Sequence, residues 1–212
     1  MTRKSPRKTW MQQHVSDPYV HKARAEGYRS RAAFKLLEIG RRDRLLRPGL
    51  VVVELGAAPG GWSQVLAAAV QPAGRVIALD LLEMEPIPGV TFVQGDFRDE
   101  AVLARLEQTL AGVRVDLVVS DMAPHLSGVG AADQARSMHL AELALEFALK
   151  QLKPEGVLLI KAFQGSGFPE LQALIRRNFA EVFTRKPRAS RDRSAEVYLL
   201  GRRPRRERPL TS

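Results

Sequence analysis

Short runs of valine, leucine and isoleucine alternate with segments of helical periodicity along most of this chain. Five apolar runs predict strands, at residues 50–55, 75–80, 90–96, 115–121 and 156–163. Helical spacing of apolar residues predicts helices at residues 62–70, 101–110, 131–152 and 168–179. Strands that are apolar along their whole length and alternate with helices are typical of a parallel sheet covered on both faces. Right-handed crossovers then lead to a doubly wound, open sheet.

Two further apolar runs, at residues 181–187 and 195–202, complete the predicted sheet. The polar stretch between them is too short for a crossover helix, so these strands should pair antiparallel at one edge. The sequence therefore predicts an α/β protein of Rossmann-like fold, with a mostly parallel seven-stranded sheet and one antiparallel edge hairpin. We expect this domain to span residues 28–201, after a basic N-terminal extension at residues 1–27 and before a basic, disordered tail at residues 202–212.

Positive charge is concentrated at the two ends of the chain, whose net charge is +10. Residues 1–47 hold 13 Lys and Arg against 4 Asp and Glu, and residues 185–212 hold 10 against 3. The intervening residues 48–184 hold 10 against 16 and are therefore acidic. Basic segments on an acidic body favour binding of a polyanion such as RNA.

The composition excludes or disfavours several classes of chemistry. The chain has no cysteine, which removes disulfides, thiolate zinc sites and catalytic thiols. Its four histidines show no metal-ligand spacing, so we expect no metal site. No apolar run approaches the roughly 20 residues that span a bilayer, and the N-terminus lacks the apolar segment of a secretory signal. We therefore expect a cytoplasmic protein without a membrane partner.

The first predicted strand runs into a glycine-rich loop, ELGAAPGGW, at residues 54–62. Glycines at such a turn let the backbone approach a ligand closely. The loop is not a phosphate-binding P-loop, because Trp62 stands where that motif has lysine. It also departs from the dinucleotide pattern, since Ala58 occupies the position of the second glycine. A nicotinamide-dependent oxidoreductase, which shares this kind of sheet, is therefore the weaker alternative.

Acidic residues end the next three predicted strands: Asp80, Asp96 and Asp121. Ligands of a doubly wound sheet bind at the carboxyl ends of its strands. Asp80 lies 24 residues after Gly56, where a carboxylate can bind ribose hydroxyls. Each aspartate could instead cap a helix N-terminus. Three of them beside a glycine-rich loop favour a site for S-adenosylmethionine, whose sulfonium cation suits an acidic rim.

Lys161 ends an otherwise apolar strand, where burying a lysine without a partner is unfavourable. The alternative is that its side chain reaches the surface. If the last strand pairs antiparallel with this one, Glu196 lies beside Lys161, although alone it would be a solvent-facing strand residue. The sequence Asp121–Pro124 lacks an aromatic side chain to stack an extruded base, which disfavours methylation of an exocyclic nitrogen.

Five segments carry a resemblance to a known family: SRAAFKLLEI with Lys35, GAAPGGWSQ, SDMAP, LLIKAFQG and SAEVYLL. In order and spacing, from about Tyr28 to Gly201, they resemble the FtsJ family of 2′-O-ribose RNA methyltransferases. The resemblance implies a catalytic tetrad of Lys35, Asp121, Lys161 and Glu196. It further implies that the cofactor S-adenosylmethionine contacts Gly60, Trp62, Asp80, Asp96 and Asp121. Lys35 lies in the basic segment 22–47, whose apolar residues show helical spacing, and could equally contact a phosphate.

The resemblance also implies a substrate, because it is closest to bacterial enzymes that methylate a uridine ribose in 23S ribosomal RNA. The expected partner is therefore the large ribosomal subunit in its assembled 50S form. We expect this chain to act on it as a monomer. A tRNA or another structured RNA is the alternative substrate, and a non-catalytic RNA-binding module is the alternative class. Lys161 would either take the proton of the 2′-hydroxyl or orient this hydroxyl.

Basic residues outside the tetrad are expected to hold the RNA backbone: Arg24, Arg29, Arg31, Arg41, Arg42 and the loop 185–193. Reading unpaired bases requires aromatic stacking, and only 6% of the chain is aromatic. We therefore expect recognition of a structured RNA or ribonucleoprotein surface more than of a short sequence.

Overall fold

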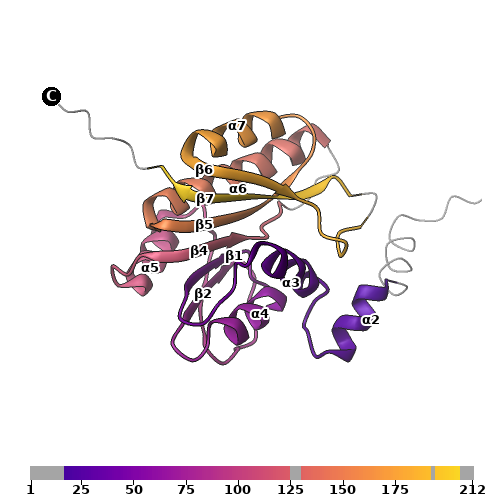
Figure 1. Cartoon of the computed structure of the whole chain (residues 1–212), viewed down its shortest axis with the longest axis vertical. Coiled ribbons are helices and arrows are strands. Elements are labelled where there is room, and N and C mark those ends of the chain that lie inside the picture. The colour runs from indigo at the N-terminus through magenta and orange to yellow at the C-terminus, as the bar shows by residue number, and fades with distance from the viewer. Residues whose placement is uncertain (1–16, 125–129, 192–193, 206–212) are drawn as a thin grey trace, which may run out of the picture.

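One sheet forms the centre of the computed structural model, which describes residues 17–124, 130–191 and 194–205 (Figure 1). The strands are β1 (Val51–Leu55), β2 (Arg75–Asp80), β3 (Val90–Gln94), β4 (Val115–Ser120), β5 (Leu152–Phe163), β6 (Phe179–Arg185) and β7 (Glu196–Pro204). They lie in the order β3-β2-β1-β4-β5-β7-β6. Strands β1 to β5 are parallel, whereas β7 runs antiparallel to both β5 and β6. The predicted α/β sheet with an antiparallel edge hairpin is confirmed.

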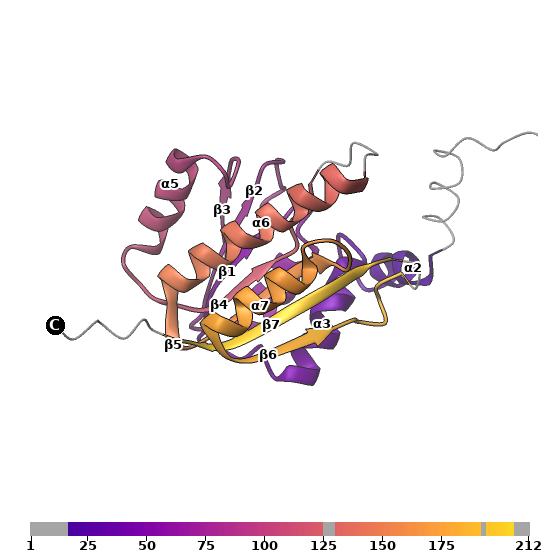
Figure 2. The same cartoon turned by 90° about the horizontal axis from the view of Figure 1, so that it is seen from above.

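Most helices cover the two faces of this sheet. The described helices are α2 (Pro18–Ala25), α3 (Ala32–Asp43), α4 (Gly61–Val70), α5 (Glu100–Leu110), α6 (Gly130–Gln151) and α7 (Phe168–Asn178). Figure 2 shows α5, α6 and α7 over one face, where a buried apolar cluster joins them to the sheet. Helices α3 and α4 cover the opposite face through a second cluster. Among the described residues, no helix combines the length and apolarity that crossing a membrane requires.

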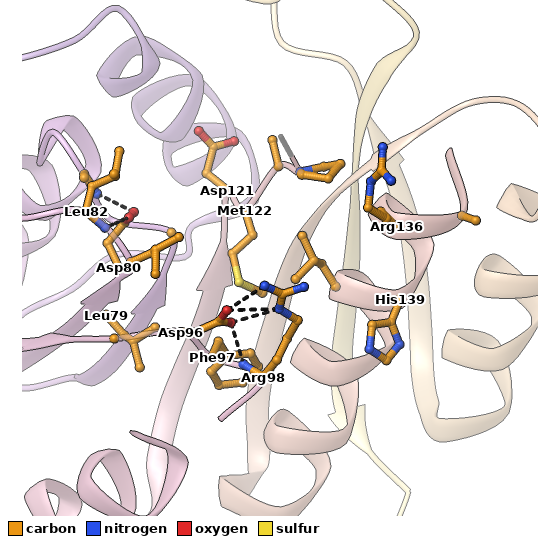
Figure 3. Close-up of a pocket in the computed structure, with 18 residues that line it drawn as sticks. Leu79, Asp80, Leu82, Asp96, Phe97, Arg98, Asp121, Met122, Arg136 and His139 are labelled. Atoms are coloured by element: carbon orange, nitrogen blue, oxygen red, sulfur yellow. Dashed lines mark hydrogen bonds and ion pairs between the residues drawn. The ribbon is translucent and has the colours of Figure 1, made fainter. Parts of the chain in front are cut away.

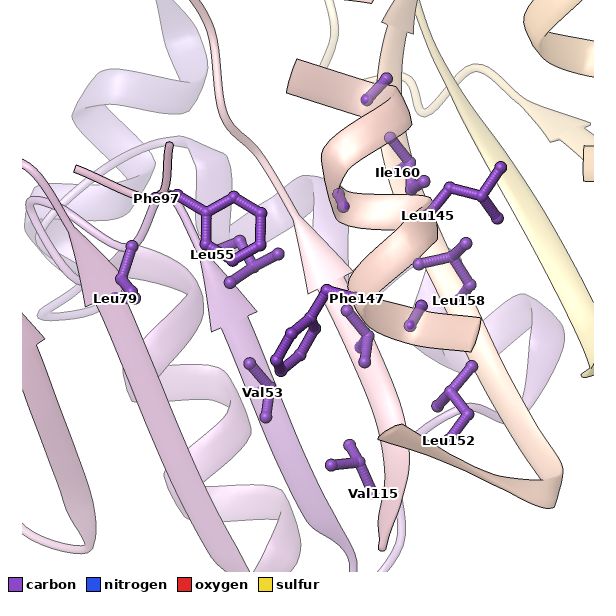
Figure 4. Packing of buried hydrophobic residues seen from close by; sticks show 14 of the residues in the cluster. Val53, Leu55, Leu79, Phe97, Val115, Leu145, Phe147, Leu152, Leu158 and Ile160 are labelled. Atoms are coloured by element: carbon purple, nitrogen blue, oxygen red, sulfur yellow. The ribbon is translucent and has the colours of Figure 1, made fainter. Parts of the chain in front are cut away.

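Alternate residues of the central strand β1 supply the two clusters. Val53 and Leu55 belong to the cluster under α6 (Figure 4), whereas Val52 belongs to the cluster under α4. Because successive side chains of a strand point to opposite faces and both faces are covered, β1 is a continuous apolar run. Fully burying a side chain of this size stabilises the fold by about 1.5–3 kcal/mol.

Strand β5 starts at Leu152, directly after α6 and four residues before its predicted start. Its pairing with β4 shifts there: Val115 lies opposite Leu152, but Leu117 lies opposite Val157. Proline has no amide hydrogen to donate to the ladder, so Pro154 interrupts regular pairing and the extra residues bulge.

The predicted N-terminal extension contains ordered residues that pack against the domain. The Asp17 side chain caps α2 by accepting from the Tyr19 amide at 3.0 Å, and it also pairs with Arg31. The Tyr19 ring packs on Phe34 of α3, with ring centroids 5.7 Å apart. Residues 17–27 therefore join the domain, while residues 1–16 lie outside the described residues.

The predicted C-terminal boundary at residue 201 differs from the structure. Residues 202–204 were expected in a disordered tail, but they belong to β7, where Arg202 pairs with Glu181 and Pro204 with Phe179 of β6. Pairing with a neighbouring strand satisfies backbone groups even in a segment of little apolar content. Residues 206–212 of the predicted tail lie outside the described residues.

The strand order reverses beside β1. The chain proceeds from β1 outward to β2 and β3, and then continues on the other side of β1 with β4 and β5. The Asp121 amide donates to the Leu55 carbonyl at 3.0 Å, which fixes the ends of β1 and β4 side by side. In doubly wound sheets, ligands bind beyond the carboxyl ends of strands at such a reversal.

Candidate active site

A cavity of about 890 Å³ lies at the carboxyl ends of β1 to β4 (Figure 3). The loops that follow these strands form one side, and α6 forms the other, with Arg136 and His139 across the cavity from Asp80. The three aspartates predicted from the strand ends, Asp80, Asp96 and Asp121, all line this cavity. The topology therefore brings together acids that are separated by up to 41 residues in the sequence.

The Asp80 carboxylate is oriented by backbone amides on both sides. It accepts from the Ala58 amide of the glycine-rich loop and from the Leu82 amide, each at 2.8 Å. A carboxylate has about four acceptor positions, so two bonds leave capacity for ligand hydroxyls. The loop can approach because Gly56 has φ +81° and a Cβ there would lie 2.8 Å from the Met122 amide nitrogen. Gly56 is thus required where the loops after β1 and β4 meet.

Asp96 is paired with a cation that the sequence analysis did not connect to it. The Arg98 side chain contacts the Asp96 carboxylate at 2.6 Å, and the Arg98 amide donates to it at 3.0 Å. These hydrogen bonds lower the pKa of Asp96 to about 2. The carboxylate is therefore an ionised acceptor at neutral pH, and the exposed Arg98 also lines the cavity.

Two residues of the predicted cofactor set, Gly60 and Trp62, are not among those that line the cavity. The Trp62 ring is buried, and its Nε1 donates to the Ala32 carbonyl at 2.7 Å. Gly60 has φ +105°, and a Cβ there would lie 2.8 Å from the Ile87 side chain. Trp62 therefore anchors the end of the glycine-rich loop, and the lack of a side chain at Gly60 lets this loop lie close to its neighbours.

The four residues of the predicted tetrad form two ion pairs on the α3 side of the sheet. Lys161 Nζ lies 3.2 Å from Asp121 Oδ1 and also donates to the Asp121 carbonyl. Lys35 Nζ of α3 lies 2.7 Å from Glu196 Oε1. All four side chains are at most 19% exposed. Lys161 therefore finds the partner that its burial requires and does not extend into solvent.

Tyr198 joins the two ion pairs, and the sequence analysis did not identify it. It lies opposite Lys161 in the β5–β7 ladder, and its hydroxyl donates to Asp121 Oδ1 at 2.7 Å. Lys35 Nζ lies 5.8 Å from the centre of its ring. Burial, together with the charges of Asp121 and Glu196, raises the pKa of Tyr198 well above its ordinary value, so the hydroxyl stays a donor. The strand period was the available signal, because Tyr198 follows Glu196 by two residues.

Three of the arginines predicted to contact RNA are engaged within the protein. Arg29 donates to backbone carbonyls beside the cavity, Arg31 pairs with Asp17, and Arg185 contacts Asp43 at 2.6 Å. Arg29 remains exposed despite these contacts, and three further arginines of the predicted set are also exposed: Arg24, Arg41 and Arg42. The basic segment thus contains arginines with structural contacts as well as arginines that face solvent.

Comparison with known proteins identifies the family to which this chain belongs. Residues 28–204 match the family described as FtsJ-like methyltransferase. A protein of an Azoarcus species is 61% identical over 201 residues, which cover 95% of this chain and 98% of the relative. A protein of Chromobacterium violaceum is 58% identical over 202 residues, with the same coverage of both chains. Both relatives are named ribosomal RNA large subunit methyltransferase E.

A solved structure with lower sequence identity supports the same assignment. A crystal structure from Plasmodium falciparum, provisionally assigned as a ribosomal RNA methyltransferase, superposes with a TM-score of 0.73 at 28% identity. The match covers 83% of this chain and 98% of that chain. The resemblance inferred from the five sequence segments is confirmed, and the chain belongs to the FtsJ-like methyltransferase family.

Proposed function

We propose that this chain transfers the methyl group of S-adenosylmethionine to the 2′-hydroxyl of a uridine ribose in 23S ribosomal RNA, within the assembled 50S subunit. The observation that carries the proposal is that Asp121 belongs both to the acid-lined cavity and to the pair with Lys161. A donor in the cavity would thus lie beside a lysine–carboxylate pair. The names of the relatives support large-subunit ribosomal RNA as the substrate. We place the chain in the cytoplasm as a monomer, in keeping with this substrate.

The cavity has a suitable size for S-adenosylmethionine, and three of its lining side chains are carboxylates that could contact the cofactor. A volume of about 890 Å³ lies within the range of small-molecule sites, about 300–1,000 Å³. We assign Asp80 to the ribose hydroxyls, since its carboxylate is already oriented by two amides. Asp96 would face the adenine side, and Asp121 would lie near the sulfonium cation. Gly60 and Trp62 would support the cofactor by holding the loop that contains Ala58.

The cofactor supplies an activated methyl group, and the tetrad would position the acceptor. With the cofactor bound, in-line displacement would form the bond from the 2′-oxygen to the methyl carbon and break the carbon–sulfur bond. We assign Lys161 to hold the 2′-hydroxyl in line, with its amine fixed by the Asp121 carboxylate and carbonyl. As the new bond forms, the hydroxyl proton leaves toward the Lys161–Asp121 pair. Lys35 and Glu196 would lie beside the Lys161–Asp121 pair and contact the ribose of the acceptor nucleotide.

Transfer of radiolabelled methyl from S-adenosylmethionine to 50S subunits, free 23S ribosomal RNA and tRNA tests this function. Each product is digested with alkali, which does not cleave next to a 2′-O-methylated ribose. Label in alkali-resistant dinucleotides from 50S subunits is expected. Label found only in tRNA would retain the chemistry and replace the substrate. Absence of label from every RNA would overturn the proposed function.

Replacing Asp80 with asparagine is expected to weaken cofactor binding about 10- to 100-fold, because a charged acceptor of hydrogen bonds is lost. Titration calorimetry with S-adenosylhomocysteine measures the effect. The control is Asp116→Asn, since Asp116 also accepts from a backbone amide, that of Val51, but at the opposite end of the sheet. Unchanged affinity in the Asp80 variant would remove this residue from the cofactor site.

Replacing Tyr198 with phenylalanine is expected to lower the single-turnover rate of methyl transfer about tenfold, because the Asp121 carboxylate loses a buried hydroxyl donor. The ring should still pack against Trp62, so the melting temperature and the affinity for S-adenosylhomocysteine should change little. Single-turnover methylation of 50S subunits measures the rate, with Tyr28→Phe as the control. An equal rate in both variants would show that the hydroxyl has no part in positioning Asp121.

A further inference from the structure

One arginine side chain bridges two loops beside the cavity. Arg29 Nη1 donates to the carbonyls of Glu85 at 2.6 Å and Pro59 at 3.3 Å, and its Nη2 donates to the carbonyl of Pro86 at 3.0 Å. Pro59 belongs to the glycine-rich loop after β1, whereas Glu85 and Pro86 belong to the loop after β2. The guanidinium suits this role because it presents several donors in a rigid plane.

Both bridged loops supply residues that line the cavity. Ala58 directly precedes Pro59, and Leu81 and Leu82 precede Glu85 in the second loop. The approach of the segments is close: a Cβ on Gly60 would lie 2.8 Å from Ile87 Cδ1 and 3.1 Å from Arg29 Nη1. A displacement of either loop would therefore move atoms of the cavity wall.

A second link fixes the backbone that carries Arg29. The Arg29 amide donates to Gln64 Oε1 at 2.8 Å, and Gln64 Nε2 donates to the Gly27 carbonyl at 2.9 Å. Gln64 lies in the first turns of α4, just after the glycine-rich loop. The segment of residues 27–29 is thus attached to α4 through one amide side chain and to the two loops through one guanidinium.

From these contacts we infer that Arg29 is a positioning residue of the cofactor site, and this inference rests on the proposed function. Arg29 lies between two helices whose arginines were expected to hold RNA, but its donors face carbonyls of the two loops. It holds the glycine-rich loop and the loop after β2 in the spacing that the cofactor requires. Arg24, on the neighbouring helix α2, carries the same charge and, like Arg29, is exposed to solvent. The carbonyl contacts of Arg29 are the observation on which its different role rests, although the two arginines are only five residues apart.

Calorimetric titration with S-adenosylhomocysteine in the absence of RNA distinguishes positioning of the cofactor site, proposed for Arg29, from contact with the RNA backbone, expected for Arg24. Arg29→Ala is expected to weaken binding about tenfold, and Arg29→Lys, which keeps the charge but not the fork of donors, should restore affinity only in part. Arg24→Ala should leave this affinity unchanged. In steady-state assays on 50S subunits, Arg29→Ala should raise KM for S-adenosylmethionine more than it lowers kcat.

The outcomes distinguish this inference from the proposed function. If the wild-type chain binds S-adenosylhomocysteine and Arg29→Ala binds it equally well, the positioning role is overturned and the proposed function stands. If the wild-type chain does not bind it, both are overturned. Gln64→Ala provides a second variant, since loss of its two hydrogen bonds should also weaken binding without removing a charge. Thermal melts of each variant confirm that it is folded.

Discussion

Replacing Lys161 with methionine is expected to lower the rate of methyl transfer about 1,000-fold, within the range of general acid–base contributions. Methionine approximates the length of the lysine stem, so packing at the end of β5 should be preserved, but Asp121 loses its cation. Binding of S-adenosylhomocysteine should change little, because the acids that line the cavity remain. Rates on 50S subunits and calorimetric affinities are measured together.

Lys153→Met provides the matched control for this substitution. Lys153 lies on the same strand and pairs with an aspartate in the same way, at 2.8 Å from Asp116 Oδ1, but at the far end of the sheet. Its loss should leave the rate unchanged. Retained turnover in the Lys161 variant, or an equal loss in both variants, would contradict the proposed role of Lys161.

Replacing Glu54 with glutamine is expected to stabilise the protein at alkaline pH. Glu54 is buried beneath α4, where Oε2 lies 2.5 Å from Ser63 Oγ and Oε1 has no hydrogen-bond partner among the described residues. Burial raises the pKa of Glu54 to about 8, and the charges of Asp121 and Asp80 act in the same direction. The folded protein therefore holds a protonated carboxyl at neutral pH.

The sign of the pH dependence follows from this raised pKa. Between the ordinary pKa of 4.5 and the folded value of about 8, the unfolded chain releases the proton of Glu54 while the folded chain keeps it. The free energy of unfolding therefore falls as pH rises through this window, by several kcal/mol in total (on the order of 1.4 kcal/mol for each pH unit). Glutamine stays neutral and removes this contribution.

Thermal melts of the wild type and of Glu54→Gln between pH 5 and pH 8 measure the effect. The melting temperature of the variant relative to wild type should rise by about 5 °C or more across this range, since 1 kcal/mol corresponds to about 2–4 °C in a domain of this size. Glu146→Gln, on an exposed helix position, is the control and should give a constant difference. Parallel curves for Glu54→Gln and wild type would show that Glu54 is not protonated in the folded state.

Much of the candidate site could be predicted from the sequence because it depends on strand ends. Parallel strands place their carboxyl ends at one edge, so Asp80, Asp96 and Asp121 could be assigned to one cavity before any contact was known. The antiparallel pairing of the last strand likewise placed Glu196 near Lys161. The alternation of apolar runs and helical periods determined the seven-stranded sheet for the same reason, since both periods are local properties of the chain.

Other features were decided only by the tertiary structure. Tyr198 became a bridge between the ion pairs because the β5–β7 register places it opposite Lys161, and a register is set by packing across strands. The sequence shows Arg29 as one more positive charge on a basic segment. Which carbonyls a guanidinium reaches depends on how distant loops approach each other in space. Local periodicity therefore determined the elements and their ends, while the partners of each charged side chain were determined by the packing of those elements.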